Sequence, residues 1–156
     1  MQQSASPTPS KLSLWIGLTR PKTLFSGLSS VLVAIFYAAS LGAIDVLRTL
    51  LLVVVAVAAQ IASNIANDLI DHRKGADTDE RKGPLRPLSR GLISEREVRL
   101  ALYLSLAVLL TSGLWLIALS SWWLLLVGLA VVLGVFAYSG GPYPLSYHGW
   151  GDAAVL

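Results

Sequence analysis

The chain has 156 residues, of which 54% are hydrophobic and only 13% are charged, with a formal net charge of +3. Soluble globular chains carry about 25% charged residues, so this composition excludes an ordinary water-soluble domain and predicts a protein whose solvent is lipid. The absence of cysteine from the sequence excludes disulfides and thiolate metal sites.

The first apolar run follows a polar tail and a proline boundary. Residues 1–10 are rich in serine and proline and predict a disordered tail, and the segment KLSLWIGL predicts a short interfacial helix. Pro21 favours a helix start, because proline suits the first helical turn. The run over about 24–42 predicts a membrane span. A signal peptide is the alternative, because YAASLGA offers small residues for cleavage, but this run exceeds the roughly 7–15 residues of a signal core.

Three further apolar runs follow, and each approaches the ~20 residues that cross the hydrocarbon core. They cover about 47–70, 98–118 and 122–138. The final segment, GWGDAAVL, has the pattern of the start of a fifth span. We therefore predict an all-α membrane protein, and we expect residues 11–156 to be the N-terminal part of a single transmembrane domain in a longer protein.

Basic residues are concentrated in two segments. The N-terminal segment and the 72–99 loop carry 11 of the 12 lysines and arginines. Two spans separate these segments, so both lie on one side, which the positive-inside rule predicts to be the cytoplasm. We predict a multi-pass protein of the inner, or plasma, membrane. No nucleic-acid binding is expected, because the basic loop lies between spans, is mixed with acids and lacks aromatic stacking platforms.

A stripe of polar side chains interrupts the apolar pattern at the end of the second run. At 100° per residue, an arc of about 100° holds Gln60, Asn64, Asn67, Asp68 and Asp71. An aspartate at the middle of a bilayer costs roughly 2.5–3.5 kcal/mol, so the stripe should face other helices or a water-filled cavity. Neighbouring carboxylates also repel each other, and a divalent cation would relieve both costs.

The spacing of these residues predicts a metal site. Asn67 and Asp71 lie four residues apart, so their oxygens share one helix face. Gly75 is predicted to end the helix, which leaves Asp77 and Asp79 on a loop that can fold back. Such oxygen ligands suit Mg²⁺, which usually keeps several waters and is shared with substrate phosphates. Basic residues follow the acidic residues directly in the chain and can bind phosphate. Acidic residues followed by basic residues are the pattern expected of a metal–pyrophosphate site.

Other interpretations of the stripe remain open from the residues alone. Asp68 and Asp71 would be a solvated helix end if they paired with Arg73 or Lys74, and the deeper amides would then be interhelical hydrogen-bonding groups. A transporter or channel fragment would use the stripe as an ion path, but a pore needs acids along its length, whereas these cluster at one mouth. A non-catalytic scaffold leaves the costly stripe unexplained.

The segment SNIANDLIDHRKGADTDERKGPLRPLSRGLIS resembles the first aspartate-rich region of the UbiA superfamily of intramembrane prenyltransferases. Its closest likeness is the 1,4-dihydroxy-2-naphthoate polyprenyltransferase branch of menaquinone synthesis. Three further pieces agree in matching order: TRPKTL before the first span, GPLRPLSRGLIS after the aspartates, and YSGGPYPLSYHGWGD after the fourth span. The resemblance covers roughly residues 18–152.

The resemblance implies a UbiA-type transmembrane helical bundle, of which this chain would hold about the first four spans and the start of a fifth. The N-D-x-x-D motif of the family falls on Asn67, Asp68 and Asp71, and implies that they hold Mg²⁺ against a prenyl pyrophosphate. Many members carry another aspartate four residues later, where this sequence has Gly75, with Asp77 two beyond. That departure fits the naphthoate branch better than a 4-hydroxybenzoate enzyme. A second aspartate motif is expected beyond the chain end.

The implied reaction transfers a polyprenyl group from polyprenyl diphosphate to 1,4-dihydroxy-2-naphthoate within the lipid bilayer, with decarboxylation, and gives demethylmenaquinone. The alternative within the family is a phytyl or geranylgeranyl donor, which gives phylloquinone or a related quinone. The predicted catalytic residues are Asp71, Asp68 and Tyr138. The predicted substrate-binding residues are Lys22, Asn64, Arg81, Lys82 and Arg86. A positive-inside loop is the alternative for the basic residues, and an aromatic belt is the alternative for Tyr138.

Overall fold

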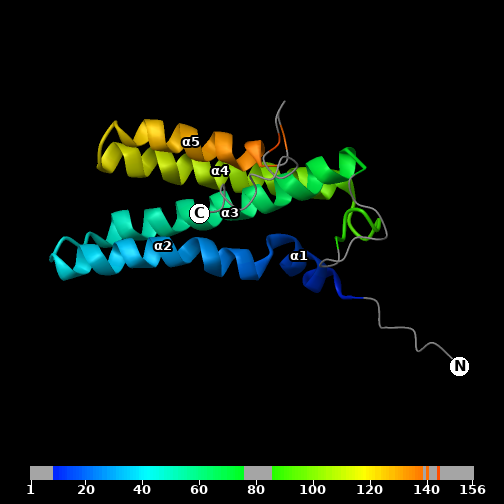
Figure 1. The fold of residues 1–156 in the computed structure, drawn as a ribbon, viewed down its shortest axis with the longest axis horizontal. Coiled ribbons are helices and arrows are strands. Elements are labelled where there is room, and N and C mark those ends of the chain that lie inside the picture. Colours follow the sequence, from blue (N-terminus) through cyan, green and yellow to red (C-terminus); the bar gives the residue numbers. More distant parts are fainter. Residues whose placement is uncertain (1–8, 76–85, 139, 141–143, 145–156) are drawn as a thin grey trace, which may run out of the picture.

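The computed structural model describes residues 9–75, 86–138, 140 and 144, and the regular structure in these residues is entirely helical. The helices are α1 (Lys11–Thr19), α2 (Pro21–Ser40), α3 (Val46–Arg73), α4 (Glu95–Leu119) and α5 (Leu124–Ala137). Figure 1 shows them as a bundle in which α3 lies between α2 on one side and the α4–α5 pair on the other. The prediction of an all-α membrane protein is confirmed.

Three helical segments are long and apolar enough to cross a membrane, and these are Lys11–Ser40, Val46–Arg73 and Glu95–Leu119. The fourth predicted span, over 122–138, is shorter in the structure, since α5 has only 14 residues. Trp122 and Trp123 lie in the turn that precedes α5 rather than in the helix itself. The chain is therefore a multi-pass membrane protein. Its predicted disordered tail and predicted fifth-span start lie almost wholly outside the described residues.

A break at Arg20 separates α1 from α2. Pro21 occupies the first turn of α2, as predicted. Arg20 takes the left-handed conformation with φ of 50°, which costs a non-glycine residue roughly 1–3 kcal/mol and persists only where the surroundings hold it. On the other side of the break, α1 packs on α3 and buries Leu14 and Leu18. The first helix is thus docked on the bundle at a fixed position.

Local capping sets the two ends of the segment between α3 and α4. Gly75 has φ of +64° and follows the last residues of α3, so the predicted role of this glycine as a helix end is confirmed. At the start of α4, the Ser94 hydroxyl accepts from Glu97 N at 3.3 Å, and Ser94 N donates to Glu97 Oε2 at 3.0 Å. This capping box begins the helix at Glu95, three residues before the predicted 98.

The core lies along α3, while α2 is covered by little protein. Small residues on α3, among them Ala58, Ala62 and Ala66, are buried and allow α4 to approach closely with Val98 and Leu102. In contrast, none of the residues of α2 is buried, and large apolar side chains on this helix are exposed. A soluble protein rarely shows such a surface, whereas hydrocarbon solvates it without cost.

We expect Gly140→Ala to destabilise the bundle. A Cβ at Gly140 would lie 2.6 Å from the Phe136 carbonyl oxygen and 3.1 Å from Ile70 Cδ1. Because the closer atom belongs to the backbone and cannot swing aside, the overpacking should cost about 1–3 kcal/mol. The measurement is the thermal unfolding midpoint of the purified protein in detergent micelles.

Gly134→Ala is the matched control for this change. No atom lies within 4 Å of its Cβ position, and the residue is inside α5, where alanine is favoured over glycine by about 0.5–1 kcal/mol. Its midpoint should stay equal to that of the native chain or rise. A Gly140→Ala midpoint as high as that of Gly134→Ala would contradict the close contact.

Candidate functional site

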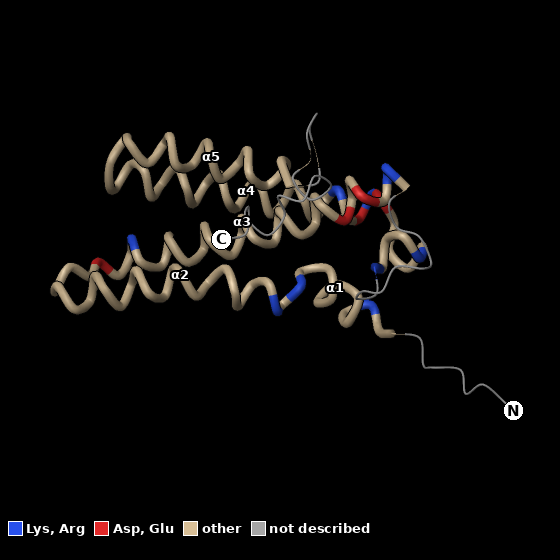
Figure 2. The backbone as a smooth tube through the Cα atoms, in the orientation of Figure 1, with Lys and Arg blue, Asp and Glu red and all other residues tan. Residues whose placement is uncertain are grey.

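The polar stripe of α3 lies in the charged end of the bundle. Figure 2 shows the Lys, Arg, Asp and Glu residues gathered mainly where α1, the end of α3 and the start of α4 meet. Four members of the stripe are buried and are only 3–7% exposed: Asn64, Asn67, Asp68 and Asp71. Gln60, one turn deeper, is partly buried. The burial of both carboxylates contradicts the alternative of a solvated helix end, and Arg73 pairs with Glu95 instead.

Two arginines hold the buried carboxylates. Arg86 Nη1 donates to Asp71 Oδ2 at 2.9 Å, and Arg86 Nε lies 3.6 Å from Asp68 Oδ1. The Arg20 guanidinium also donates to Asp68 Oδ1. Both aspartates therefore converge on Arg86, whose own side chain is only 12% exposed. Pairing of this kind is required, because a buried charge without a partner is strongly destabilising.

Sequence reasoning missed Arg20 and selected Lys22 instead. In the structure Lys22 is exposed in the first turn of α2, whereas Arg20 reaches Asp68 across to α3. Helical periodicity does not extend across a break, so no sequence pattern predicts the direction in which the Arg20 side chain points. The available signal was its position directly before Pro21, where the backbone must leave the helical conformation.

Asn64 ties the same break to α3. Its Nδ2 donates to the Thr19 carbonyl oxygen at 2.8 Å and to Thr23 Oγ1 at 2.9 Å. These bonds span Arg20 on both sides, and they satisfy a carbonyl that the end of α1 leaves without a helical partner. This geometry favours the interhelical interpretation of Asn64 over its predicted contact with substrate.

Among the described residues, Oδ1 of Asn67 is the one fully buried side-chain oxygen or nitrogen that has no hydrogen-bond partner. A buried polar atom without a partner costs about 1–3 kcal/mol, so such an atom marks a position where a ligand would be bound favourably. The stripe therefore offers an amide oxygen next in sequence to a buried carboxylate, with a second carboxylate one turn later.

This donor set fits magnesium. Carboxylate and amide oxygens are its usual protein ligands, and it commonly binds through one or two carboxylates while water and substrate phosphates complete the octahedron. Within residues 9–75 and 86–138, no group of three or more His, Cys, Asp or Glu side chains is assembled for a metal. The described oxygens would therefore hold the cation only together with ligands from outside them.

Of the remaining predicted site residues, Tyr138 is among those that the structure describes. Tyr138 follows the end of α5 and is partly buried. Gly140, two residues later, lies against the Ile70 side chain of α3. Asp77, Arg81 and Lys82 lie outside the described residues, so their assignments stay predictions.

Comparison with known proteins gives one family. The model of the UbiA prenyltransferase family matches residues 27–156. The 1,4-dihydroxy-2-naphthoate octaprenyltransferase of Escherichia coli (strain K12) is 35% identical over 154 residues, which cover 94% of this chain and 50% of that protein. The protein of the same name from Mycobacterium tuberculosis is 39% identical over 142 residues, covering 91% of this chain and 48% of that one.

A more distant relative is the UbiA prenyltransferase domain-containing protein 1 of Dictyostelium discoideum, 28% identical over 162 residues, which cover 99% of this chain and 49% of the relative. The chain thus spans about half the length of the curated relatives that it matches. No solved structure gave a significant match.

We expect Arg20→Gln to destabilise the fold through Asp68. Removal of one partner from a buried ion pair typically costs 3–5 kcal/mol, and Arg86 Nε at 3.6 Å offsets only part of this loss, so we expect about 2–3 kcal/mol. In the double variant Arg20→Gln/Asp68→Asn the buried charge is gone, and most of the stability should return. The measurement is reversible unfolding in mixed micelles.

Arg48→Gln serves as the control, because Arg48 is exposed at the opposite end of α3. It should change the free energy of unfolding by less than about 0.5 kcal/mol. If the double variant were no more stable than Arg20→Gln alone, the coupling between the two side chains would be refuted.

Proposed function

Because the chain belongs to the UbiA prenyltransferase family, as the match over residues 27–156 establishes, we propose that it forms the first polar site of a Mg²⁺-dependent polyprenyltransferase. The donor is polyprenyl diphosphate and the acceptor is 1,4-dihydroxy-2-naphthoate, in line with the names of the relatives that are 34–39% identical. The observation that carries the proposal is a buried pair of carboxylates beside an unsatisfied amide oxygen, at an end of the bundle rich in arginine and lysine.

The acidic half of the site binds the cation. Asp68 and Asp71 would provide carboxylate oxygens and Asn67 would provide Oδ1. Asp77, outside the described residues, stays a proposed further ligand on its sequence position alone. Magnesium, when bound, supplies positive charge that stabilises the departing diphosphate. The low-polarity surroundings of α3 strengthen each of these contacts relative to the same contacts in water.

The basic half of the site binds the diphosphate. Arg86 lies against both carboxylates, and Arg20 lies against one of them, so both guanidinium groups are already at the centre of the site. A guanidinium presents several donors in one plane and can bond a phosphate while it keeps a carboxylate contact. Lys22, exposed in the first turn of α2, adds positive charge at this end of the bundle. Arg81 and Lys82 stay proposed diphosphate ligands from the residues alone, because both lie outside the described residues.

These residues assist a reaction whose main task is electrostatic. The allylic C–O bond breaks and its electron pair stays on the diphosphate, whose growing negative charge is stabilised by donors fixed in advance. An electron-rich ring carbon of the naphthoate forms the new C–C bond, and that carbon loses its carboxylate as CO₂. The ring of Tyr138 stabilises the positive charge on the allylic carbon through its π-face. The site opens at the end of the bundle that is rich in Lys and Arg, and the positive-inside rule assigns this end to the cytoplasmic side of the plasma membrane.

Asp71→Asn should abolish turnover while the protein still inserts and folds. The amide keeps the size of the side chain but removes a negative ligand, so we expect a loss of at least about 100-fold in prenyl transfer. The assay follows formation of prenylated naphthoate in membranes that contain the complete protein, of which this chain is expected to be the N-terminal part, with magnesium and without it. Binding of Mn²⁺ as a spectroscopic substitute for Mg²⁺ is measured in parallel by electron paramagnetic resonance.

Asp45→Asn is a closely matched control, since it makes the same chemical change on the same helix. Asp45 caps the N-terminus of α3 through its bond from Arg48 N at 2.8 Å, and asparagine caps equally well. This variant should keep full Mn²⁺ binding and turnover. Unchanged Mn²⁺ binding in Asp71→Asn would remove Asp71 from the metal site, whatever the turnover.

A further inference from the structure

A cavity lies on the opposite side of α3 from the aspartates. It has a volume of about 360 Å³ and is formed by residues of α3, α4 and α5. At 100° per residue, Leu69 and Arg73 in its lining point away from Asn64 and Asp71, Ile70 lies on the flank of α3, and no residue of the polar stripe lines the cavity. The cavity is therefore separate from the proposed catalytic site, and its volume falls within the range of about 300–1,000 Å³ that small ligands occupy.

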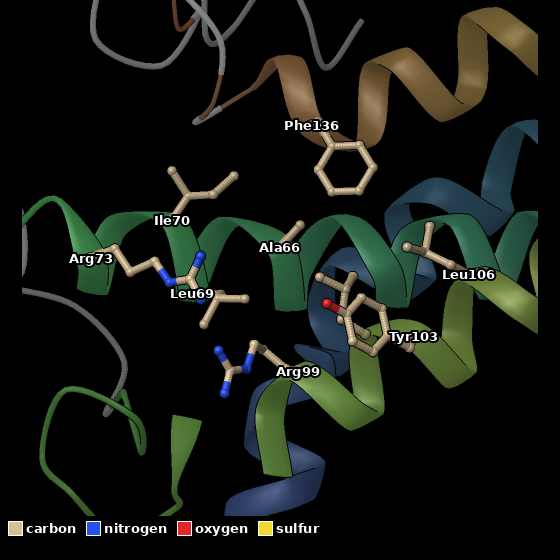
Figure 3. Close-up of a pocket in the computed structure, with 9 residues that line it drawn as sticks. Ala66, Leu69, Ile70, Arg73, Arg99, Tyr103, Leu106 and Phe136 are labelled. Atoms are coloured by element: carbon tan, nitrogen blue, oxygen red, sulfur yellow. The ribbon is translucent and has the colours of Figure 1, made fainter. Parts of the chain in front are cut away.

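The cavity has one cationic end and one apolar end. Figure 3 shows the guanidinium groups of Arg73 and Arg99 on one side of it, with Leu106, Phe136 and the ring of Tyr103 on the other. Apolar side chains thus line most of the space, and charge is confined to the end that belongs to the basic end of the bundle.

The two arginines share a single carboxylate. Arg73 Nη2 lies 2.6 Å and Arg99 Nη1 lies 3.5 Å from the same atom, Glu95 Oε1. One positive charge is therefore left over among the three side chains. The arginine side chains are 52% and 44% exposed, so part of their donor capacity stays accessible to a ligand.

We propose that this cavity binds an anionic phospholipid, with the phosphate on Arg73 and Arg99 and the upper acyl chain along the apolar wall. Basic pockets between membrane helices on the side rich in Lys and Arg bind such head groups. A free phosphate would make no contact with the apolar wall. A neutral apolar molecule would not neutralise the net positive charge of Arg73, Arg99 and Glu95. An amphiphile with a negative head satisfies both ends at once.

The test is native mass spectrometry of the intact chain, released from micelles that contain equal amounts of phosphatidylglycerol and phosphatidylcholine. We expect one retained phosphatidylglycerol per chain and little phosphatidylcholine. In Arg73→Gln/Arg99→Gln, the retention of phosphatidylglycerol should fall about tenfold or more, because both head-group contacts are lost. Equal retention of the two lipids by the native chain would overturn the proposal.

Arg90→Gln/Arg96→Gln is the matched control. It removes the same charge from the same end of the bundle, at exposed residues that do not line this cavity. Retention of phosphatidylglycerol should be unchanged, and an equal loss in the two double variants would show only a diffuse charge effect and refute a defined site. Millimolar glycerol phosphate should not displace the lipid, and full displacement would also refute the role of the apolar wall.

Glu95→Gln provides a second variant that leaves both arginines in place. It removes the carboxylate that competes for their donors, so phosphatidylglycerol should be retained several-fold more strongly. Weaker retention in this variant would contradict the proposal even if Arg73→Gln/Arg99→Gln folded poorly. Retention of a second copy of the chain in place of lipid would overturn it as well.

Discussion

The need to compensate two carboxylates within an apolar bundle governs the arrangement of this protein. Asp68 and Asp71 are buried on the last turns of α3, whose middle, residues 50–59, is wholly apolar, and burial of a charge in such surroundings requires close cationic partners. The partners come from two distant parts of the chain, Arg20 before α2 and Arg86 in the turn before α4. These ion pairs draw both connections onto the same end of α3. The ion pair of Arg20 and the bonds from Asn64 together hold the α1–α2 break against α3.

The helices were largely predictable because a membrane imposes a simple composition rule on any segment that crosses it. Pro21 and Gly75 marked helix ends for local backbone reasons, and both are helix ends in the structure. The short α5 was not foreseen, because hydropathy cannot distinguish a tryptophan in a turn, such as Trp122, from one inside a helix. Arg20 was missed for a related reason: its partner lies 48 residues away, and no periodic pattern links the two.

The candidate site was predictable as a set of residues on one face, but its internal roles were not. Spacing on α3 identified the stripe correctly, whereas only coordinates reveal that Asn64 bonds the α1–α2 junction and that Asn67 Oδ1 has no partner in the described residues. Two amides on the same arc therefore behave differently. One is occupied by a contact between helices, and the other keeps an acceptor available. Hydrogen-bond satisfaction depends on what the neighbouring helices present, which the sequence of one helix does not contain.

Polar and apolar side chains lie on different faces of α3, so the same helix can hold buried charges and also pack within a membrane bundle. Its stripe of amides and carboxylates turns toward the α1–α2 break, while its small residues pack against α4 and bury Ala62 and Ala66 almost completely. The small face lets helices approach closely without a hydrophobic driving force, which lipid does not provide. The polar face is then held by tightly packed neighbours, and its charges are fixed before any ligand arrives. Such preorganisation is what electrostatic catalysis requires, because donors that are already oriented need no rearrangement as charge develops. The packed end of α3, with its charges held in place, therefore suits the proposed chemistry, in which a departing diphosphate is stabilised.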